Sequence, residues 1–483
     1  MTDTILALDV GTTSLRAIVF SLDGNILGQG RSRITSLYPK LGHVEQDAEL
    51  LWHNMIDVIQ CALKCAKKDK QEIAAIGITA QRSSIVVWDA ETGCALSPMV
   101  IWSDTRAVGG VDWLAKGYLV VPQMAAAKLP LVIEKIIGSN TQTKQKNLRW
   151  GNIDSYLTWK LTNGVSHITD RSQAATTGYL NPATLDWNDA LIEEQGLDRE
   201  LFPKIVDSWD DLTVTSKQAF GARIPITAII ADQQSAMMAH GAVTPGKCKV
   251  SYGTSGSFNI NTGGNMIMVA PTLPPWVQYT KAGTTNYCIE GMVMSVGSMF
   301  DWLMTINIID NIEECQLMAE QVSDSAGVFV LPSIHGVGAP YGKPEQKGMI
   351  GGLTSGSTKA HIIRATMEGI AFRIREVTDF VYNSTSLARL SQVPADGGAS
   401  RNDLFMQIQA DILNLPVARH ITCEATALGA AISAGLGANL FELNDISRFA
   451  KYDRIFEPQI SADEAESRLC NWQALVSNST INH

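Results

Sequence analysis

The sequence contains no uninterrupted run of 18 apolar residues, and Asp3 and Asp9 break the N-terminal stretch where a signal peptide would need an apolar core. Its eight cysteines form no Cys-x-x-Cys pair and have no histidine at metal-ligand spacing. Positive charge is in deficit, because 38 Lys and Arg face 48 Asp and Glu for a net charge of −10. These absences argue against a membrane span, a structural zinc site and non-specific affinity for nucleic acid or anionic lipid. We therefore expect a cytoplasmic protein that binds a small molecule and has neither a nucleic-acid nor a membrane partner.

The cysteines also indicate the redox environment. Cys61 and Cys65 lie four residues apart on a predicted helix, where we expect buried free thiols rather than a site. A reducing compartment follows from this expectation.

Length and composition predict two globular domains. The chain has 483 residues, of which 45% are hydrophobic and 18% charged. This length exceeds one typical core, and the composition is that of a folded protein. The turn at residues 244–246 (Thr-Pro-Gly) suggests a boundary, so we divide the chain into residues 1–244 and 245–483.

The N-terminal stretch predicts a hairpin that could hold a phosphate. An apolar run ends at Asp9, Gly11 begins a bend with three successive hydroxyl residues, and a second apolar run follows. Gly11 lets the backbone approach an anion, and Asp9 could hold a metal ion or its waters. An ordinary hairpin remains equally open, because Thr is common in strands.

A second stretch repeats this plan in the other half of the chain. Residues 249–260 again read strand, Gly-Thr-Ser bend, strand. Two phosphate-type hairpins, one in each half, suggest two related domains that share a nucleotide.

Three further strand ends carry groups suited to chemistry. Gln81 and Arg82 follow the β-branched run 73–79, which is where α/β sheets usually present ligand groups. Asp232 follows the buried run 226–231, as a helix N-cap or as a general base. At residues 102–106, Trp, Asp and Arg lie close together, and taken alone they favour a surface ion pair beside a core Trp.

The second half of the chain contains two predicted helices and a Gly-Gly turn of interest. Residues 363–381 carry one apolar stripe of a long helix, and the helix at 424–437 is so rich in Ala and Gly that another element must pack closely against it. Gly397 and Gly398 precede a helix whose first amides could meet a phosphate or a ribose, or form only a tight turn. Residues 107–150 are weakly patterned, with a solvated loop expected at 140–147.

Seven motifs together resemble those of the FGGY family of carbohydrate kinases, and the glycerol kinase branch most of all. The similarity runs from about residue 5 to about residue 440. The motifs read DVGTTS at 9–14, GHVEQD at 42–47, GITAQR at 77–82, DQQ at 232–234, YGT at 252–254, GAPY at 338–341 and DGGA at 396–399. The resemblance implies an α/β fold of two actin-like, ribonuclease-H-like domains, with mixed sheets flanked by helices around an ATP cleft. It also implies magnesium-dependent transfer of the γ-phosphoryl group to a hydroxyl of a small sugar or polyol.

The resemblance assigns roles to individual residues. Asp232 is the implied base, and Asp9 the implied Mg²⁺ residue. The implied acceptor contacts are Gln81, Arg82, Trp102, Asp232 and Gln233. The implied ATP contacts are Thr12, Thr13, Ser14, Arg16, Thr254, Gly297, Gly398 and Asn402.

The acceptor site departs from the glycerol kinase pattern. Ser83 stands where glycerol kinases have Glu, Gln123 where they have Tyr, and Ser257 where they have Phe. We therefore expect a ketopentose or a polyol of four to seven carbons, with glycerol as the alternative acceptor. A catalytically silent actin-like sensor or scaffold is the alternative of another class, and a homodimer is kept as an option for the oligomeric state.

Overall fold

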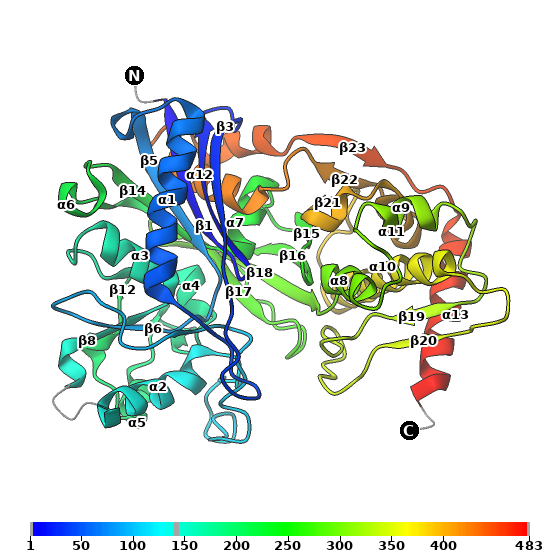
Figure 1. Cartoon of the computed structure of the whole chain (residues 1–483), viewed down its shortest axis with the longest axis horizontal. Helices are drawn as coiled ribbons and strands as arrows, with labels where there is room; N and C mark the ends of the chain where they lie inside the picture. Colours follow the sequence, from blue (N-terminus) through cyan, green and yellow to red (C-terminus); the bar gives the residue numbers. More distant parts are fainter. Residues whose placement is uncertain (1–2, 140–143, 481–483) are drawn as a thin grey trace. The chain divides into compact units, whose positions relative to one another are not determined.

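The computed structural model describes residues 3–139 and 144–480, and these form two compact α/β units (Figure 1). Unit 1 comprises Met1–Ala239, Trp276–Asn286 and Thr426–Phe449, and unit 2 comprises His240–Pro275, Tyr287–Ala425 and Ala450–His483. The two units are therefore interleaved in the sequence. Our division after residue 244 stays a prediction, since compact units and sequence domains need not share a boundary.

Unit 1 is built on a six-stranded mixed sheet. Its first three strands form the predicted antiparallel meander, and β1 also pairs in parallel with β5, which in turn pairs in parallel with β14. The strand order is β13 (Trp209–Val214), β14 (Pro225–Ala231), β5 (Ile73–Ala80), β1 (Thr4–Val10), β2 (Ser14–Ser21) and β3 (Ile26–Arg33).

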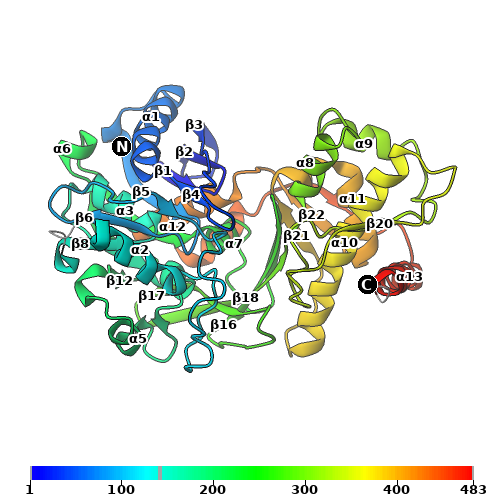
Figure 2. The ribbon, with the colours of Figure 1, turned by 60° about the horizontal axis from the view of Figure 1, so that its bottom comes forward.

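Helices cover both faces of this sheet, and β5 shows why. Ile76 and Ile78 are fully buried in the core that β5 shares with α1 (Ala48–Ala66) and α3 (Ile153–Leu161). Gly77 points to the opposite face, because successive side chains of a strand alternate. A Cβ there would lie 2.2 Å from the carbonyl oxygen of Ala430 in α12 (Ala425–Gly437), which packs beside α7 (Asp232–Ala239) (Figure 2). The close approach expected for the Ala- and Gly-rich helix is confirmed.

A smaller layer of unit 1 lies beyond the sheet and has its own aromatic core around Trp150. Its elements include α2 (Ala125–Ser139), which contains Pro130 and forms within the weakly patterned segment 107–150. The remaining elements are β4 (Glu45–Gln46), η1 (Lys70–Glu72), β6 (Val86–Asp89), β7 (Met99–Val100), α2 (Ala125–Ser139), η2 (Gln145–Asn147), β8 (Leu148–Gly151), β9 (Ile168–Asp170), α4 (Arg171–Ala175), β10 (Leu180–Asn181), β11 (Asp186–Trp187), α5 (Asp189–Glu194), η3 (Arg199–Leu201), β12 (Lys204–Val206), α6 (Lys217–Phe220) and η5 (Leu443–Phe449).

The second large sheet has seven strands. The β15–β16 hairpin confirms the predicted repeat of the strand–bend–strand plan, and β15 pairs in parallel with β21. The order is β17 (Pro275–Lys281), β18 (Thr284–Val293), β16 (Gly256–Gly263), β15 (Cys248–Tyr252), β21 (Val393–Asp396), β22 (Val417–His420) and β23 (Tyr452–Phe456).

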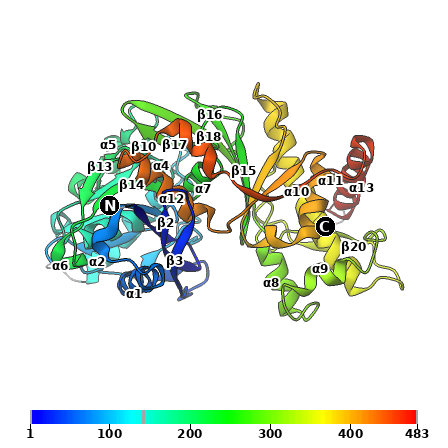
Figure 3. The ribbon, with the colours of Figure 1, turned by 90° about the horizontal axis from the view of Figure 1, so that it is seen from above.

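The long helix α10 (Lys359–Ser384) is the centre of the unit 2 core. Its predicted apolar stripe from Ile363 to Val381 is buried, and α10 lies beside α11 (Asp403–Leu413) and α13 (Ala462–Thr480) (Figure 3). The other elements are α8 (Gly297–Thr305), α9 (Glu314–Ala319), η4 (Gly398–Arg401) and the β19 (Phe329–Leu331) and β20 (Met349–Gly351) ribbon.

The structure differs from the prediction at two cysteines of α1. Cys61 and Cys65 are exposed, so the prediction that they are buried is wrong. They lie outside the buried stripe of α1, which includes Met55, Ile59 and Ala62. Part of the loop expected at 140–147 falls outside the described residues, and Gln145–Asn147 form a short 3-10 turn.

No helix within the described ranges combines the length and the apolar character that a membrane span requires.

Candidate active site

Three parallel strands of unit 1 bring the predicted catalytic and acceptor residues to one edge of the sheet. Asp9 is the penultimate residue of β1, Gln81 and Arg82 directly follow β5, and Asp232 directly follows β14. The register aligns these ends, because Asp9 is paired with Thr79 and the last residue of β14 with the last of β5. Carboxyl ends of neighbouring parallel strands are the usual ligand side of an α/β sheet.

The first hairpin joins a buried carboxylate to a cation. Asp9 and Arg16 are cross-strand partners, and Arg16 Nη1 lies 3.0 Å from Asp9 Oδ2. The turn closes through the Gly11 amide, which donates to the Ser14 carbonyl at 3.0 Å. Arg31 on β3 reaches the Ser14 hydroxyl at 3.5 Å. Around this bend, two guanidinium groups face one carboxylate, which leaves one surplus positive charge for an anion site on an acidic protein.

A hydrogen-bonded chain of side chains links the hairpin to the end of β5. The Trp102 indole N–H donates to the Thr12 hydroxyl at 3.0 Å, and that hydroxyl lies 3.4 Å from Gln81 Oε1. Gln81 Nε2 donates to Gln46 Oε1 at 3.2 Å, and Gln46 Nε2 donates back to the Thr12 carbonyl at 2.8 Å. The predicted residues Thr12, Gln81 and Trp102 are thus brought together. Gln46 completes the chain and was missed, although it lies within the GHVEQD motif.

Arg82 and Asp232 face each other between neighbouring strands. Arg82 Nε lies 3.2 Å from Asp232 Oδ1, with 14% and 23% of the two side chains exposed. The same oxygen accepts the Gln233 amide at 2.8 Å. The carboxylate is therefore partly exposed at the start of α7 and is oriented by a guanidinium and a backbone amide.

The charged residues that follow Trp102 form a buried ion pair. Asp104 is fully buried, and Arg106 donates to both of its oxygens at 2.8 Å and also to Glu45 at 2.8 Å. Burial disfavours the charged carboxylate, but the Arg106 hydrogen bonds and the Val44 amide outweigh it and lower the pKa of Asp104. The predicted surface ion pair beside a core Trp is wrong, because the ion pair is buried and Trp102 is half-exposed.

A buried lysine supports the same segment from below. Lys128 on α2 has no exposed surface, and its ammonium donates to the carbonyls of Ile101 at 2.9 Å and Asp104 at 3.4 Å. Burial lowers the pKa of Lys128 to about 7. Sequence reasoning missed this residue, although a Lys on the same helical face as Ala125 and Val132 breaks the apolar pattern and could have identified it.

In unit 2, the bend after β15 holds the start of α8. The Gly297 amide donates to the Gly253 carbonyl at 2.9 Å, and the Thr254 carbonyl accepts the Val296 and Ser298 amides at 3.1 and 3.2 Å. A Cβ on Gly297 would lie 2.7 Å from the Gly253 oxygen, so this contact requires glycine. The predicted nucleotide residues Thr254 and Gly297 are therefore neighbours.

The neighbouring strand β21 contributes the Gly-Gly turn at the same edge. Ser251 of β15 pairs with Asp396 of β21, so Thr254 and Gly398 follow adjacent parallel strands. A Cβ on Gly398 would meet nothing within 4 Å, so this position faces open space. Asn402 caps α11, because its side-chain oxygen accepts the Phe405 amide at 2.9 Å.

The three departures from the glycerol kinase pattern differ in their surroundings. Ser83 has a left-handed backbone, with φ of 52°, and its buried hydroxyl donates to the Thr176 carbonyl at 2.5 Å. Gln123 is exposed, and the Ser257 hydroxyl donates within β16 to Asn259 at 2.8 Å. The Ser83 hydroxyl is therefore already hydrogen-bonded to a backbone carbonyl.

Both α/β units therefore present polar groups near the carboxyl ends of their strands. Residues 4–239 match the model described as "FGGY family of carbohydrate kinases, N-terminal domain", and residues 248–438 match that of the C-terminal domain. The chain belongs to the FGGY family of carbohydrate kinases, enzymes that transfer a phosphoryl group to an alcohol.

Individual relatives show which members of the family the chain is similar to. The chain is 37% identical to the glycerol kinase of Acinetobacter baylyi, over 99% of each chain. It is 36% identical to that of Rippkaea orientalis, over 98% of this chain and 97% of the relative. The crystal structure of Plasmodium falciparum glycerol kinase with ADP is 26% identical and covers 98% of each chain, with a TM-score of 0.88. The xylulose kinase of Lactobacillus acidophilus is 22% identical over 99% of this chain and 98% of that one; its TM-score of 0.84 supports the fold alone.

Proposed function

We propose that this protein is an ATP-dependent glycerol kinase, with Asp232 as the base. The observation that carries the proposal is the Arg82–Asp232 pair at 3.2 Å, on the sheet edge that also holds Asp9 and Gln81. A base that serves a hydroxyl must be accessible and held in one orientation. Asp232 meets both requirements, because it is partly exposed and bound by Arg82 and the Gln233 amide.

In the proposed reaction, the acceptor oxygen forms a bond to the γ-phosphorus of ATP while the bond from that phosphorus to the bridging oxygen of ADP breaks. Asp232 takes the proton of the acceptor hydroxyl, and Arg82 keeps the carboxylate pointing toward it. Gln81, Trp102 and Gln233 complete the acceptor contacts. Little covalent chemistry is asked of the protein, so positioning and charge neutralisation account for most of the rate.

The first hairpin is the proposed phosphate and metal site. Thr12, Thr13 and Ser14 supply hydroxyl and amide donors, and Arg16 supplies charge. Asp9 is the proposed Mg²⁺ residue, and one carboxylate fits this ion, which usually keeps several waters and binds substrate phosphates. When bound, Mg²⁺ would neutralise phosphate charge. Among the described residues, no cluster of three or more His, Cys, Asp or Glu offers an alternative cage.

The strand ends of unit 2 are the proposed nucleotide contacts. Thr254 and Gly297 form one rigid bend, and Gly398 leaves space for a ligand to approach the backbone. Because the Asn402 oxygen is used as a helix cap, its amide N–H groups are the part that we assign to the nucleoside.

Glycerol is proposed as the acceptor on the strength of the relatives. Full-length relatives at 34 to 37% identity carry the name glycerol kinase, which favours glycerol over the ketopentose or longer polyol that the three departures suggested. Membership in a family of enzymes argues against the silent sensor or scaffold. A cytoplasmic location and a homodimer stay part of the proposal, to be tested by cell fractionation and light scattering.

One observation keeps a larger acceptor as a second candidate. Ser83 puts no carboxylate at the position where the resemblance implies an acceptor for substrate hydroxyls, and its own hydroxyl is bound to Thr176. A site that loses a partner for a substrate hydroxyl discriminates less against other acceptors.

Initial-rate measurements of ADP release test both candidates. We expect kcat/KM to be highest for glycerol in a panel with erythritol, D-ribulose, D-xylulose and L-xylulose. If a longer compound ranks first, the larger-acceptor candidate replaces glycerol, and Ser83→Glu should then raise glycerol turnover. If no acceptor raises turnover above the background ATPase, the kinase proposal fails.

A further inference from the structure

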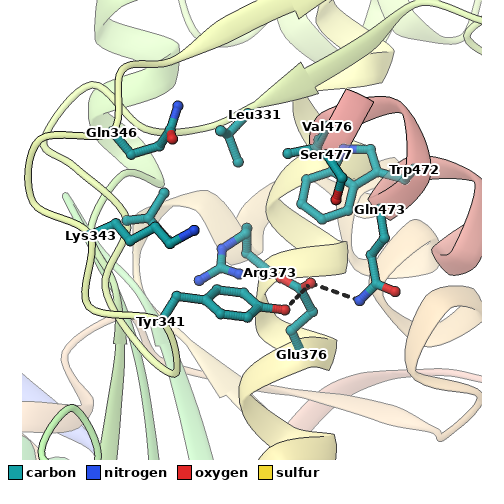
Figure 4. A pocket seen from close by; sticks show the side chains of 11 residues that line it. Leu331, Tyr341, Lys343, Gln346, Arg373, Glu376, Trp472, Gln473, Val476 and Ser477 are labelled. Atoms are coloured by element: carbon teal, nitrogen blue, oxygen red, sulfur yellow. Dashed lines mark hydrogen bonds and ion pairs between the residues drawn. The ribbon is translucent and has the colours of Figure 1, made fainter. Parts of the chain in front are cut away.

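Unit 2 contains a cavity of about 320 Å³ that the proposed reaction does not use. Its walls come from α10, from α13 and from the loop between β19 and β20 (Figure 4). None of the residues assigned to the nucleotide or the acceptor lines it. The cavity therefore needs an explanation of its own.

A fixed guanidinium forms the floor of the cavity. Arg373 is only 2% exposed and donates to the Glu376 carboxylate and to the Ala339 carbonyl. Its guanidinium carbon also lies 5.0 Å from the centroid of the Tyr341 ring. Because three neighbours hold it, Arg373 would lose little side-chain freedom on binding a ligand.

The one carboxylate among the lining residues is already bound by donors. Glu376 accepts from the Tyr341 hydroxyl and from Gln473 Nε2, both at 2.8 Å, in addition to Arg373 (Figure 4). These three hydrogen bonds occupy both carboxylate oxygens. Glu376 therefore offsets the charge of Arg373 and presents little acceptor capacity to the cavity.

A second cation leaves the cavity with net positive charge. Lys343 lies on the loop opposite α10 with an exposed side chain, and within the described ranges its ammonium is in no ion pair. With Arg373 and Lys343 against Glu376, the lining carries one surplus positive charge. This surplus stands out on a chain whose net charge is −10.

The rest of the lining combines apolar side chains with the polar residues Gln346, Gln473 and Ser477. Leu331, Trp472 and Val476 lie beside the charged groups (Figure 4). Val337 also lines the cavity. The cavity volume lies at the lower end of the roughly 300–1,000 Å³ range of small-molecule sites. Small-molecule sites commonly combine such an apolar wall with a few convergent polar groups.

We propose that this cavity is a binding site for a small organic anion, distinct from the phosphotransfer site. The carboxylate or phosphate group of the ligand lies between Lys343 and Arg373, and its short apolar body packs on Trp472 and Leu331. Charge-assisted hydrogen bonds from both cations supply the selectivity for anions. This assignment does not depend on which acceptor the enzyme phosphorylates.

Calorimetric titration of the full-length protein tests the site. Benzoate and phenyl phosphate are the anionic probes, and benzyl alcohol is a neutral probe of similar size. Saturating ADP is present to keep phenyl phosphate away from the proposed nucleotide site, whereas the benzoate titration is informative with or without ADP. We expect both anions to bind at one site per chain and benzyl alcohol to bind about tenfold more weakly or worse.

Variants on the exposed loop locate the binding without endangering the fold. Lys343→Gln should weaken both anions about tenfold, and Lys343→Glu should weaken them further. Lys347→Gln removes an equally exposed charge from the same loop but outside the cavity lining, and should leave the affinities unchanged. Equal binding of benzyl alcohol and the anions, or wild-type affinity in both Lys343 variants, would overturn the proposal. Unchanged turnover of the variants shows that they fold.

Discussion

Arg82 Nε and Asp232 Oδ1 lie 3.2 Å apart, although the two residues are separated by most of unit 1 in the sequence. The contact forms because β5 and β14 are parallel neighbours whose last residues are in register. Asp232 directly follows β14 and Arg82 is the second residue after β5, so the sheet brings them close together. A carboxylate at the start of a helix thereby acquires a cationic partner while 23% of its side chain stays exposed.

Replacing the proposed base should separate catalysis from folding. A positioned general base contributes about a hundred- to ten-thousandfold in rate, so Asp232→Asn should lower kcat by that factor and leave the KM for ATP nearly unchanged. Asn also accepts a hydrogen bond at a helix start, so the variant should keep its melting temperature. Steady-state kinetics and thermal unfolding measure both effects. Wild-type turnover in Asp232→Asn would reduce this residue to a helix cap.

Lys128 should act through the segment that carries Trp102. Lys128→Met keeps an unbranched side chain but removes the donors to the Ile101 and Asp104 carbonyls. Trp102 should then lose its fixed position, and we expect kcat/KM for the acceptor to fall about tenfold or more while the KM for ATP stays constant. Each buried carbonyl left without a donor should also cost about 1–3 kcal/mol of stability.

A conservative exchange provides the control for Lys128. Lys128→Arg keeps a donor to these carbonyls but must fit a larger head group into a site without exposed surface. Partial recovery of acceptor KM in this variant would support a positioning role. If Lys128→Met changes ATP and acceptor parameters equally, its effect is general destabilisation and the positioning role is wrong.

Adding one methyl group to Gly297 should disturb the proposed nucleotide site. A Cβ there would lie 2.7 Å from the Gly253 carbonyl oxygen, so α8 or the bend at Thr254 must shift. We expect Gly297→Ala to raise the KM for ATP about tenfold and to change the acceptor KM little. The matched control is Gly138→Ala, because a Cβ at that position meets nothing within 4 Å. Unchanged ATP kinetics in Gly297→Ala would argue against the assignment.

The pH dependence of stability should report the buried carboxyl group of Asp154. Burial raises the pKa of Asp154 to about 7, against the Thr169 hydrogen bond, which lowers it. The folded state therefore binds this proton more tightly than the unfolded state, so the stabilisation is complete below about pH 4 and is lost as the pH rises to about 7. A shift of about three units corresponds to an upper limit of about 4 kcal/mol.

Urea unfolding of wild type and Asp154→Asn between pH 4 and 8 measures this contribution. The wild-type free energy of unfolding, minus that of the variant, should fall across this range and then level off. Other groups that titrate in the same window, such as His167, are common to both proteins and largely cancel in the difference. A difference that does not vary with pH would contradict the raised pKa.

Local patterns were sufficient for much of the fold. Asp47 caps α1, since its carboxylate accepts the Leu50 amide at 2.9 Å, and the predicted apolar stripe of α10 is buried. Both Gly-Thr hairpins form between the strands that flank them. These features depend on residues close together in the chain, which is why periodicity and turn chemistry predict them.

The sequence predicted the burial of individual side chains and the partners of polar groups less well. Cys61 and Cys65 were expected inside but lie off the buried stripe of α1, and the Asp104–Arg106 pair was expected at the surface but lies inside. Helix α2 forms around Pro130 in a segment without clear pattern. For Arg106, a contact comes from a distant part of the chain, the carboxylate of Glu45.

The sequence by itself determined the family, the two Gly-Thr hairpins and the residue types available for phosphoryl transfer. Only the tertiary structure decided which of them meet. Arg82 reaches Asp232 because parallel pairing of β5 and β14 aligns strand ends that are remote in the chain. Trp102 follows β7, outside that sheet, and still reaches Thr12 at 3.0 Å. The cavity around Arg373 likewise exists only because α13 folds back onto α10. Short-range patterns encode elements, whereas the distances between side chains depend on how the sheet orders those elements.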